Sequence, residues 1–310
     1  QAPAASARTI TSRRSPRRAR LPEGAPTGSV PPVSDHALTA SAPGSLMLFG
    51  EHAVLHGHLA LVGAVSQRLR VTLTPHAGSA IRIRSALGEY ASDLRNPAPS
   101  ETFRFMVAAL RVFADDLPSG FSLQVDSEFA STIGFGSSAA VTVATVGALL
   151  HWSRGTAPAD QVFSTARRLI RDVQGAGSGA DVAASVHGGL VLYRAEPLEI
   201  EPLPHTHPLT AVYSGSKLAT PLVIALVEER RKLFPQIYGQ LFDTMDQCTM
   251  NAADAVAMQD WKTFGQMLNI AQGLMDALGV NNGALSKVIY DLRADPAILG
   301  AKISGSGLGD

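Results

Sequence analysis

Apolar and polar residues alternate with a period of two over several short stretches of the chain, and this alternation predicts β-strands. Strands are expected at 46–49, 69–73, 81–83, 121–125 and 190–193; the first and the last are short apolar runs, and the other three alternate. The turn Pro75–Gly78 separates the second stretch from the third, so we expect these two to pair as an antiparallel hairpin. Arg82 and Arg84 alternate with the apolar residues of the third stretch and should face water.

A period near 3.6 predicts helices between and after these strands. Helices are expected at 102–117, 139–150, 160–173, 181–186, 222–233, 237–258, 261–278 and 284–293. One more strand is expected at Leu209–Tyr213, just after the Pro-rich passage Glu196–Pro208, which is typical of a crossing between domains. We therefore expect an N-terminal domain over 38–204 and a C-terminal domain over 205–310, the latter truncated at its end.

Composition narrows the classes of protein. The 310 residues, of which 45% are apolar and 17% charged, can bury a sizeable core and favour two domains. Lysine and arginine together number 26, as do aspartate and glutamate, so we expect neither nucleic acid nor a membrane as a partner. The longest apolar run, 139–150, is too short to span a bilayer. The only cysteine, Cys248, excludes an intramolecular disulfide and favours a reducing, cytoplasmic location.

The first 37 residues differ from the rest of the chain. Up to Pro32 they include six arginines, a single acid (Glu23) and almost no large apolar side chains. The composition superficially resembles that of a transit peptide, but no amphipathic period accompanies it. We expect residues 1–37 to form a disordered, solvated arm.

A small-residue turn, Gly134–Ser138, runs directly into the apolar helix predicted at 139–150. Free backbone N–H groups and the positive end of a helix dipole meet at such a junction, which suits a phosphate group. The alternative is an ordinary buried helix with a Gly/Ser cap, and this stretch alone leaves both open. Two further glycine-rich turns lie at 175–179 and 305–309, and together the three turns favour a bound polyanion that they surround. None of the three fits the Walker phosphate-binding pattern or the dinucleotide-binding pattern.

Asp181 is the acid best placed for chemistry. It follows a Gly-Ser-Gly-Ala turn and precedes the apolar residues 182–184, which we expect to desolvate it, so it could take a proton from an attacking hydroxyl. Its alternative is a helix N-cap. Glu51 and His52, after a buried strand, either bind a polar substrate or form an ordinary strand-end pair.

Three motifs in this order carry a family resemblance: APGSLMLFGEHAV at 42–54, IGFGSSAA at 133–140 and KISGSGLG at 302–309. Over residues 41–310 the sequence resembles the GHMP kinase family, and within it the mevalonate kinases. The resemblance implies an α+β fold of two domains, the first like domain 2 of ribosomal protein S5 and the second ferredoxin-like. It also implies ATP and Mg²⁺ as cofactors and mevalonate as the small-molecule substrate, and it leaves a homodimer open.

The resemblance also implies roles for individual residues. Asp181 matches the aspartate that orients and deprotonates the substrate hydroxyl. The triphosphate would be held by Gly134, Phe135, Gly136, Ser137, Ser138, Ala139 and Ala140, with the Ser138 hydroxyl reaching Mg²⁺. The residues expected to face the substrate are Glu51, His52, Lys217, Thr220, Ser304 and Gly305.

Two departures from the family pattern concern the catalytic residues. Ser45 stands where the family usually has a lysine that assists Asp181, so either activity is reduced or another cation substitutes. The usual acidic Mg²⁺ ligand has no clear match, and Asp172 is the candidate replacement. Phosphomevalonate kinase is the runner-up, because its GSG-x-DVAA pattern is similar to residues 177–184 of this chain. The second alternative is a kinase-fold protein that binds metabolites with weakened catalysis.

Overall fold

The computed structural model describes residues 36–175, 177–215 and 218–309. The described residues cluster as one compact unit. Nearly all of the arm expected at 1–37 lies outside the described residues, as does Lys217. Within the described ranges, no helix is both long and apolar enough to span a membrane.

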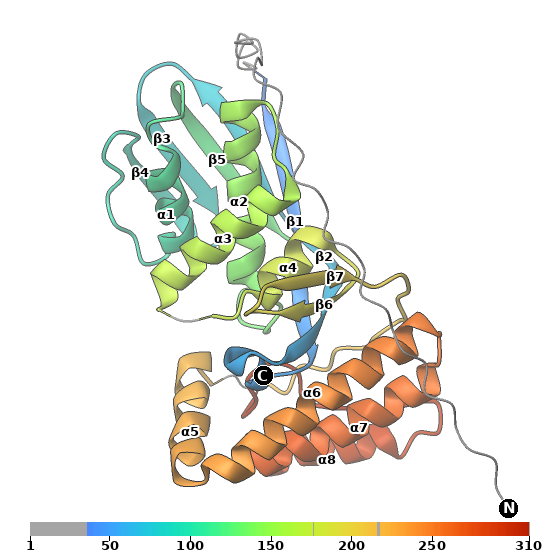
Figure 1. Cartoon of the computed structure of the whole chain (residues 1–310). Coiled ribbons are helices and arrows are strands. Elements are labelled where there is room, and N and C mark those ends of the chain that lie inside the picture. Colours follow the sequence, from blue (N-terminus) through green and yellow to red (C-terminus); the bar gives the residue numbers. More distant parts are fainter. Residues whose placement is uncertain (1–35, 176, 216–217, 310) are drawn as a thin grey trace, which may run out of the picture. The chain divides into compact units, whose positions relative to one another are not determined.

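One mixed sheet is formed by strands between residues 38 and 202 (Figure 1). Its strands are β1 (Leu38–Phe49), β2 (Leu59–His76), β3 (Ala80–Ser85), β4 (Gly88–Asp93), β5 (Gly120–Ser127), β6 (Leu190–Arg194) and β7 (Glu199–Pro202). The strand order is β4-β3-β5-β2-β6-β7, and β1 pairs with β2. All pairs are antiparallel except β3 with β5. The long central strand β2 therefore pairs with β1 along one edge, and with β6 and then β5 along the other.

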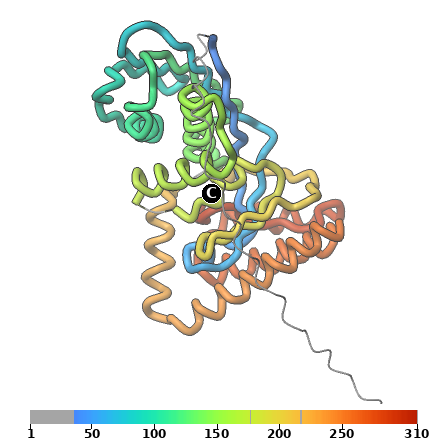
Figure 2. Tube along the Cα trace, turned by 45° about the horizontal axis from the view of Figure 1, so that its top comes forward, coloured from blue at the N-terminus to red at the C-terminus, as the bar shows by residue number. Residues whose placement is uncertain are grey.

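Helices follow the predicted segments closely. They are the short 3₁₀ helix η1 (Ala53–His56), α1 (Arg104–Phe113), α2 (Ser137–Arg154), α3 (Ala159–Gln174), α4 (Ala180–His187), α5 (Thr220–Leu233), α6 (Pro235–Ala257), α7 (Trp261–Leu278) and α8 (Gly283–Arg293). The mixture of one sheet and these helices confirms the predicted α+β class. Figure 2 shows α5 to α8 in orange and red, following the sheet strands in the chain.

The expected hairpin between 69–73 and 81–83 is wrong. Both segments are strands, and Arg82 and Arg84 are exposed as predicted, but β5 lies between β2 and β3. Phe121 on β5 is the partner of Pro75 on one side and of Ile81 on the other. Alternation shows which face of a strand is buried, but it does not identify the strand's neighbours; here the crossover through α1 makes β5 parallel to β3.

The strand expected at Leu209–Tyr213 is also wrong, because this segment belongs to no ladder. Leu209, Val212 and Tyr213 are exposed and line a cavity of about 690 Å³ together with residues of α7 and α8. Apolar alternation without a neighbouring strand does not satisfy the backbone hydrogen bonds that define a sheet.

Side chains on the two faces of β2 belong to two different clusters of the buried core. Ala60 and Val62 belong to the cluster formed with α1 to α4, whereas Leu61 packs with residues of α6 and α7. Successive side chains of a strand point to opposite faces. Helices α6 and α7 therefore cover one face of β2, and α4 lies on the other face. A third cluster joins Ala53 of η1 and Ile303 to α5, α6, α7 and α8.

Candidate active site

The glycine-rich turn delivers the chain onto the first turn of α2. Gly136 precedes the helix with φ 59° and ψ 34°, a left-handed conformation, and no side chain caps the helix. The first intrahelical bond runs from Ala140 N to Gly136 O at 3.1 Å, so the amides of 137–139 have no helical acceptor. Ser137 and Ser138 are partly exposed, whereas Ala139 and Ala140 are buried. Of the Gly/Ser cap considered from sequence, the structure has the glycine, Gly136, at the N-cap position, and because no side chain occupies the free amides the geometry also suits an anion.

This turn is packed directly on β1. A Cβ added to Gly136 would lie 2.1 Å from Ser45 Oγ, and one added to Gly44 would lie 2.7 Å from Phe135 O. Ser45 N also donates a hydrogen bond to Phe135 O at 3.1 Å. Glycine is therefore required at both positions by close approach, and at Gly136 by its positive φ as well.

Ser45 joins the glycine turn to Asp181. Its hydroxyl donates to Asp181 Oδ1 at 2.9 Å, and the serine is only 1% exposed. Asp181 lies in the first turn of α4, after the N-cap residue Gly179, and so it is not the cap. Its expected desolvation is wrong, because Asp181 is exposed while the apolar residues 182–184 are buried. Neighbouring positions of a helix point to different faces, so an apolar run need not bury the residue before it.

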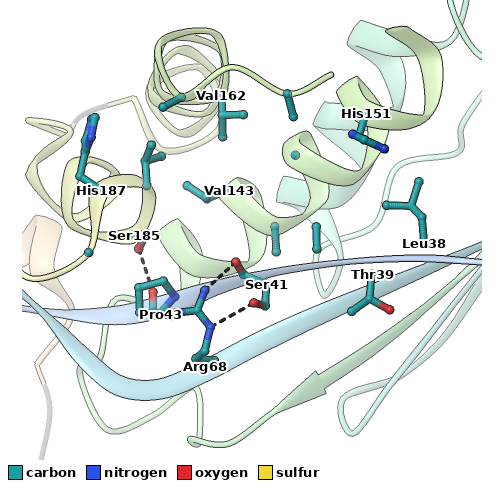
Figure 3. A pocket seen from close by; sticks show the side chains of 17 residues that line it. Leu38, Thr39, Ser41, Pro43, Arg68, Val143, His151, Val162, Ser185 and His187 are labelled. Carbon is teal, nitrogen blue, oxygen red and sulfur yellow. Dashed lines mark hydrogen bonds between the residues drawn. The ribbon is translucent and has the colours of Figure 1, made fainter. Parts of the chain in front are cut away.

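A second bond fixes α4 to β1. Ser185 is buried and donates its hydroxyl to Pro43 O at 3.0 Å, two residues before Ser45 (Figure 3). The close-up also shows Arg68 donating to the hydroxyl and carbonyl oxygens of Ser41. These residues line a cavity of about 620 Å³ bounded by β1, α2 and α4, which contains none of the residues predicted to be catalytic or to bind ligands.

Glu51 forms a buried ion pair that the motifs did not predict. Its Oε1 accepts from Lys302 Nζ, and the two side chains are 2% and 4% exposed. Among the described residues, Glu51 Oε2 has no hydrogen-bond partner. Burial raises the pKa of Glu51, although Lys302 opposes that shift. Lys302 is the first residue of the third motif, and that position was the only sequence signal for it.

His52 and Ser304 hold the same two segments together. His52 Nε2 lies 3.0 Å from Ser306 O, so the ring carries its proton on Nε2 and donates it. Burial lowers the pKa of His52. Ser304 Oγ donates to Met47 O at 2.9 Å. Residues 304–306 therefore lie against the end of β1 and the loop that follows it.

The segment after His52 is fastened to α5 and α6. The His56 ring stacks on Phe242, with centroids 4.8 Å apart, and its Nε2 lies 2.7 Å from Glu228 Oε1. Burial alone would raise the pKa of Glu228, but hydrogen bonds and charges from Arg231 and His56 lower it overall. At the start of β2, Leu59 N donates to Asp246 Oδ1 at 2.5 Å.

A cavity of about 740 Å³ opens beside the first turn of α2. Ser137, Ser138 and Val141 line it from α2, and Phe103 and Phe129 contribute aromatic surface. Its volume is within the range of small-molecule sites, and apolar side chains share its lining with polar and charged ones such as Thr102, Arg104 and Glu128. The cavity can therefore take the apolar part of a ligand whose anionic part lies at the glycine turn.

Of the remaining predicted residues, Asp172 and Thr220 show no contact with this arrangement within the described part of the chain, whereas the Gly305 backbone lies near enough to Glu51 to oppose the rise of its pKa. Asp172 is exposed near the end of α3, and no hydrogen bond or ion pair brings it to Ser138. The described part of the chain holds no group of three or more His, Cys, Asp or Glu residues that could bind a metal. Thr220 is exposed at the start of α5, and Gly305 has φ 80°. These assignments, and that of Lys217, stay predictions.

Known proteins resemble this chain over most of its length. The family model of the GHMP kinases N terminal domain matches residues 104–189, and that of the GHMP kinases C terminal domain matches 252–310. The mevalonate kinase of Archaeoglobus fulgidus is 34% identical over 88% of this chain and 90% of that protein. The mevalonate kinase of Methanothermobacter thermautotrophicus is 31% identical over 87% and 88% respectively.

Two solved structures share the fold. L. major mevalonate kinase in complex with R-mevalonate superposes with a TM-score of 0.72 at 24% identity, covering 88% of this chain and 85% of that one. Streptococcus pneumoniae phosphomevalonate kinase, in complex with phosphomevalonate and AMPPNP, gives a TM-score of 0.74 at 19% identity, covering 88% and 90%. At these identities the likeness speaks for the fold alone, and it confirms the fold class expected from the three motifs.

Proposed function

The chain belongs to the GHMP kinase family of ATP-dependent small-molecule kinases, and we propose that it phosphorylates mevalonate to 5-phosphomevalonate in isoprenoid precursor synthesis. The curated relatives at 31–34% identity that cover nearly the whole chain support mevalonate as the acceptor. We further propose that the enzyme works in the cytoplasm.

One observation supports the proposal: Ser45 contacts both the proposed base, Asp181, and the glycine turn that suits the phosphates. Its hydroxyl binds the Asp181 carboxylate, and the same oxygen fills the space that a side chain on Gly136 would need. The proposed base is thereby held next to the turn that suits the phosphates. Phosphoryl transfer depends mainly on such positioning and on electrostatic stabilisation.

The roles of the chain's own residues follow from this arrangement. The free amides of 137–139 and the dipole of α2 would bind the triphosphate and stabilise charge on the transferred phosphoryl group. The nucleoside would lie in the 740 Å³ cavity that begins at Ser137 and Ser138. Asp181, oriented by Ser45, would accept the proton of the primary hydroxyl of mevalonate as that oxygen attacks the γ-phosphorus and the bond from phosphorus to the departing ADP breaks.

Magnesium fits this site only in part. The Ser138 hydroxyl is partly exposed in the first turn of α2 and can serve as a ligand, with Asp172 as the proposed acid. Because Mg²⁺ usually keeps several waters and uses one or two carboxylates with the phosphates, a dedicated acidic cluster is not required. When bound, Mg²⁺ would neutralise charge on the phosphate oxygens.

On the acceptor side we propose that Glu51, His52, Lys217, Thr220, Ser304 and Gly305 contact mevalonate. The buried Glu51 and His52 are held in fixed positions by Lys302 and Ser306, which supports a binding surface that needs little rearrangement. Lys302 and Ser306 of the third motif would thus support this surface from behind, whereas Ser304 and Gly305 of the same motif would form part of it.

A coupled assay of ADP release tests the proposal. Mevalonate, phosphomevalonate, homoserine and galactose are offered in parallel with ATP and Mg²⁺, and mevalonate should give the highest kcat/KM. A preference for phosphomevalonate would identify the runner-up instead. Preference for either of the other two acceptors would leave only the family assignment standing.

Replacing Ser45 separates an enzyme from a binding protein with weakened catalysis. In Ser45→Lys an ammonium group is restored beside Asp181, where the family usually has one. A large gain in rate would mean that the scaffold is competent and lacks only that charge. If calorimetry detects nucleotide or mevalonate binding while neither the natural chain nor Ser45→Lys turns over any acceptor, the chain is a binding protein.

A further inference from the structure

The turn that precedes Asp181 rests on the side chain of a buried tyrosine. Tyr193 lies on β6, where its register partners are Ala60 of β2 and Ile200 of β7, and it is fully buried. Its hydroxyl donates to Ser178 O at 2.5 Å. The sheet core is therefore connected directly to the residue three positions before Asp181.

The same turn is confined on several sides. A Cβ on Gly179 would lie 2.8 Å from Tyr193 Oη and 2.9 Å from Arg167 Cδ, and Gly179 has φ 94°. Arg167 is itself held, because its Nη2 donates to Ala195 O at 3.1 Å. Ser178 Oγ accepts a hydrogen bond from Ala180 N at 3.2 Å. The turn is thus fixed by contacts and not only by its own glycines.

The position of the turn sets the position of Asp181. Gly179 is the N-cap of α4, and Asp181 is the second residue of that helix, so a shift of the cap moves the carboxylate with it. Only eight residues form α4, and Ser185 anchors its far half to Pro43. A displacement of about 1 Å at a reacting group can change a rate about a hundredfold.

We propose that Tyr193 is a positioning residue for Asp181, whose hydroxyl holds the 178–180 turn so that the carboxylate meets the acceptor hydroxyl in the productive orientation. This inference rests on the proposed kinase function. Tyr193 is fully buried and lies outside the cavity assigned to the nucleoside, so its effect passes through Ser178 and α4. Its removal should lower the rate of transfer while nucleotide binding is retained.

The Tyr193 hydroxyl can donate its hydrogen bond to the 178–180 turn at every pH at which the enzyme would be assayed. Burial raises the pKa of Tyr193 to about 12, against the opposing influence of Arg167 and Arg171. The hydroxyl therefore stays protonated and remains a donor to Ser178 O near neutral pH. Any kinetic effect of removing it should accordingly be constant between about pH 6 and 9.

Tyr193→Phe tests the proposal, since it removes only the hydroxyl and keeps the packed ring, including its contact with Phe163. We expect kcat to fall about tenfold or more, with KM for ATP and the affinity for ADP changed less than about twofold. Tyr90→Phe is the matched control, because Tyr90, on the edge strand β4 far from β6 in the strand order, also donates its hydroxyl to a backbone carbonyl, that of Ala98 at 2.7 Å. It should leave kcat unchanged.

A readout without turnover separates this inference from the proposed function. The amide of Ala183 donates to Gly179 O at 3.0 Å in the first turn of α4. Its hydrogen exchange should accelerate in Tyr193→Phe and stay unchanged in Tyr90→Phe, whichever acceptor the protein uses. Unchanged exchange, or a kcat equal to that of the natural chain well below the melting temperature, overturns the proposal. An equal loss of kcat and of ADP affinity also overturns it, because it would show a general disruption of the site.

Discussion

The phosphate side and the acceptor side of the candidate site consist of different kinds of chemical group. The phosphate side is main chain: left-handed glycines, the uncapped first turn of α2 and the tight contact of Gly136 with Ser45. The acceptor side is side chains, with Ser45 bound to Asp181 and Glu51 bound to Lys302, which is 251 residues away in the sequence. A main-chain site is sensitive to added atoms, whereas a side-chain site is sensitive to lost charges and hydrogen bonds.

The largest effect should come from the acceptor side. Asp181→Asn keeps the size of the side chain and the hydrogen bond to Ser45, but it removes the base, so kcat should fall about 10²–10⁴-fold. Steady-state kinetics measures kcat, and calorimetry with ADP measures nucleotide binding separately. The ADP affinity should be retained. Asp160→Asn, at an exposed carboxylate in the first turn of α3, is the control. Near-normal turnover of Asp181→Asn would remove the aspartate from its role.

The buried ion pair gives the next effect, on stability. Lys302→Met leaves the Glu51 carboxylate buried without its cation and should lower the free energy of unfolding by about 3–5 kcal/mol. The double variant Glu51→Gln/Lys302→Met should recover most of that loss, because no charge is then left unpaired.

Urea unfolding measures both variants against Lys287→Met. Lys287 forms an exposed i,i+4 pair with Asp291, and its replacement should cost less than about 0.5 kcal/mol. A loss in Lys302→Met no larger than that of the exposed pair would mean that the acceptor side does not depend on its buried charges.

Gly136→Ala tests the phosphate side. The added methyl group meets Ser45 Oγ, and a left-handed alanine costs about 1–2 kcal/mol. We expect KM for ATP to rise about tenfold. Gly78→Ala is the control, because Gly78 also has a positive φ (87°) while its Cβ would meet nothing within 4 Å. Equal stability losses with an unchanged KM in both variants would show that backbone strain alone, and not the contact with β1, matters at Gly136.

The smallest effect is a pH dependence at His52. Because burial lowers its pKa, the unfolded chain takes up this proton more readily than the folded one. His52 therefore contributes stability above its ordinary value of 6.5, and that contribution is lost as the pH falls from 6.5 toward the lower folded-state pKa. Glu51, whose pKa is raised, has the opposite sign. The unfolding free energy of His52→Gln should thus decline less between pH 7.5 and 5.5 than that of the natural chain; parallel curves would contradict this.

The turn and the helix of the phosphate side could be predicted from sequence because their determinants are local, whereas this stretch alone left a phosphate site and an ordinary capped helix both open. Gly134 to Ser138 specify a turn, and the apolar run after them specifies a helix whose first amides are free. The acceptor side could be predicted only through family motifs. Alternation alone did not identify β5 as the strand beside β3, and nothing near Tyr193 or Lys302 in the sequence shows that they touch Ser178 and Glu51. Such contacts depend on long-range pairing of strands, which local patterns do not encode.

The pairing of β2 has a consequence for synthesis on the ribosome. One edge of this long strand is covered by β1 as soon as residue 76 has emerged, but the other waits for β5 and for β6, which ends at Arg194. At ordinary translation speeds that interval lasts roughly ten seconds. During it the nascent chain presents an unpaired, apolar strand edge, the kind of surface on which aggregation begins. Newly made chains should therefore be clients of ribosome-associated chaperones until β6 has closed the sheet.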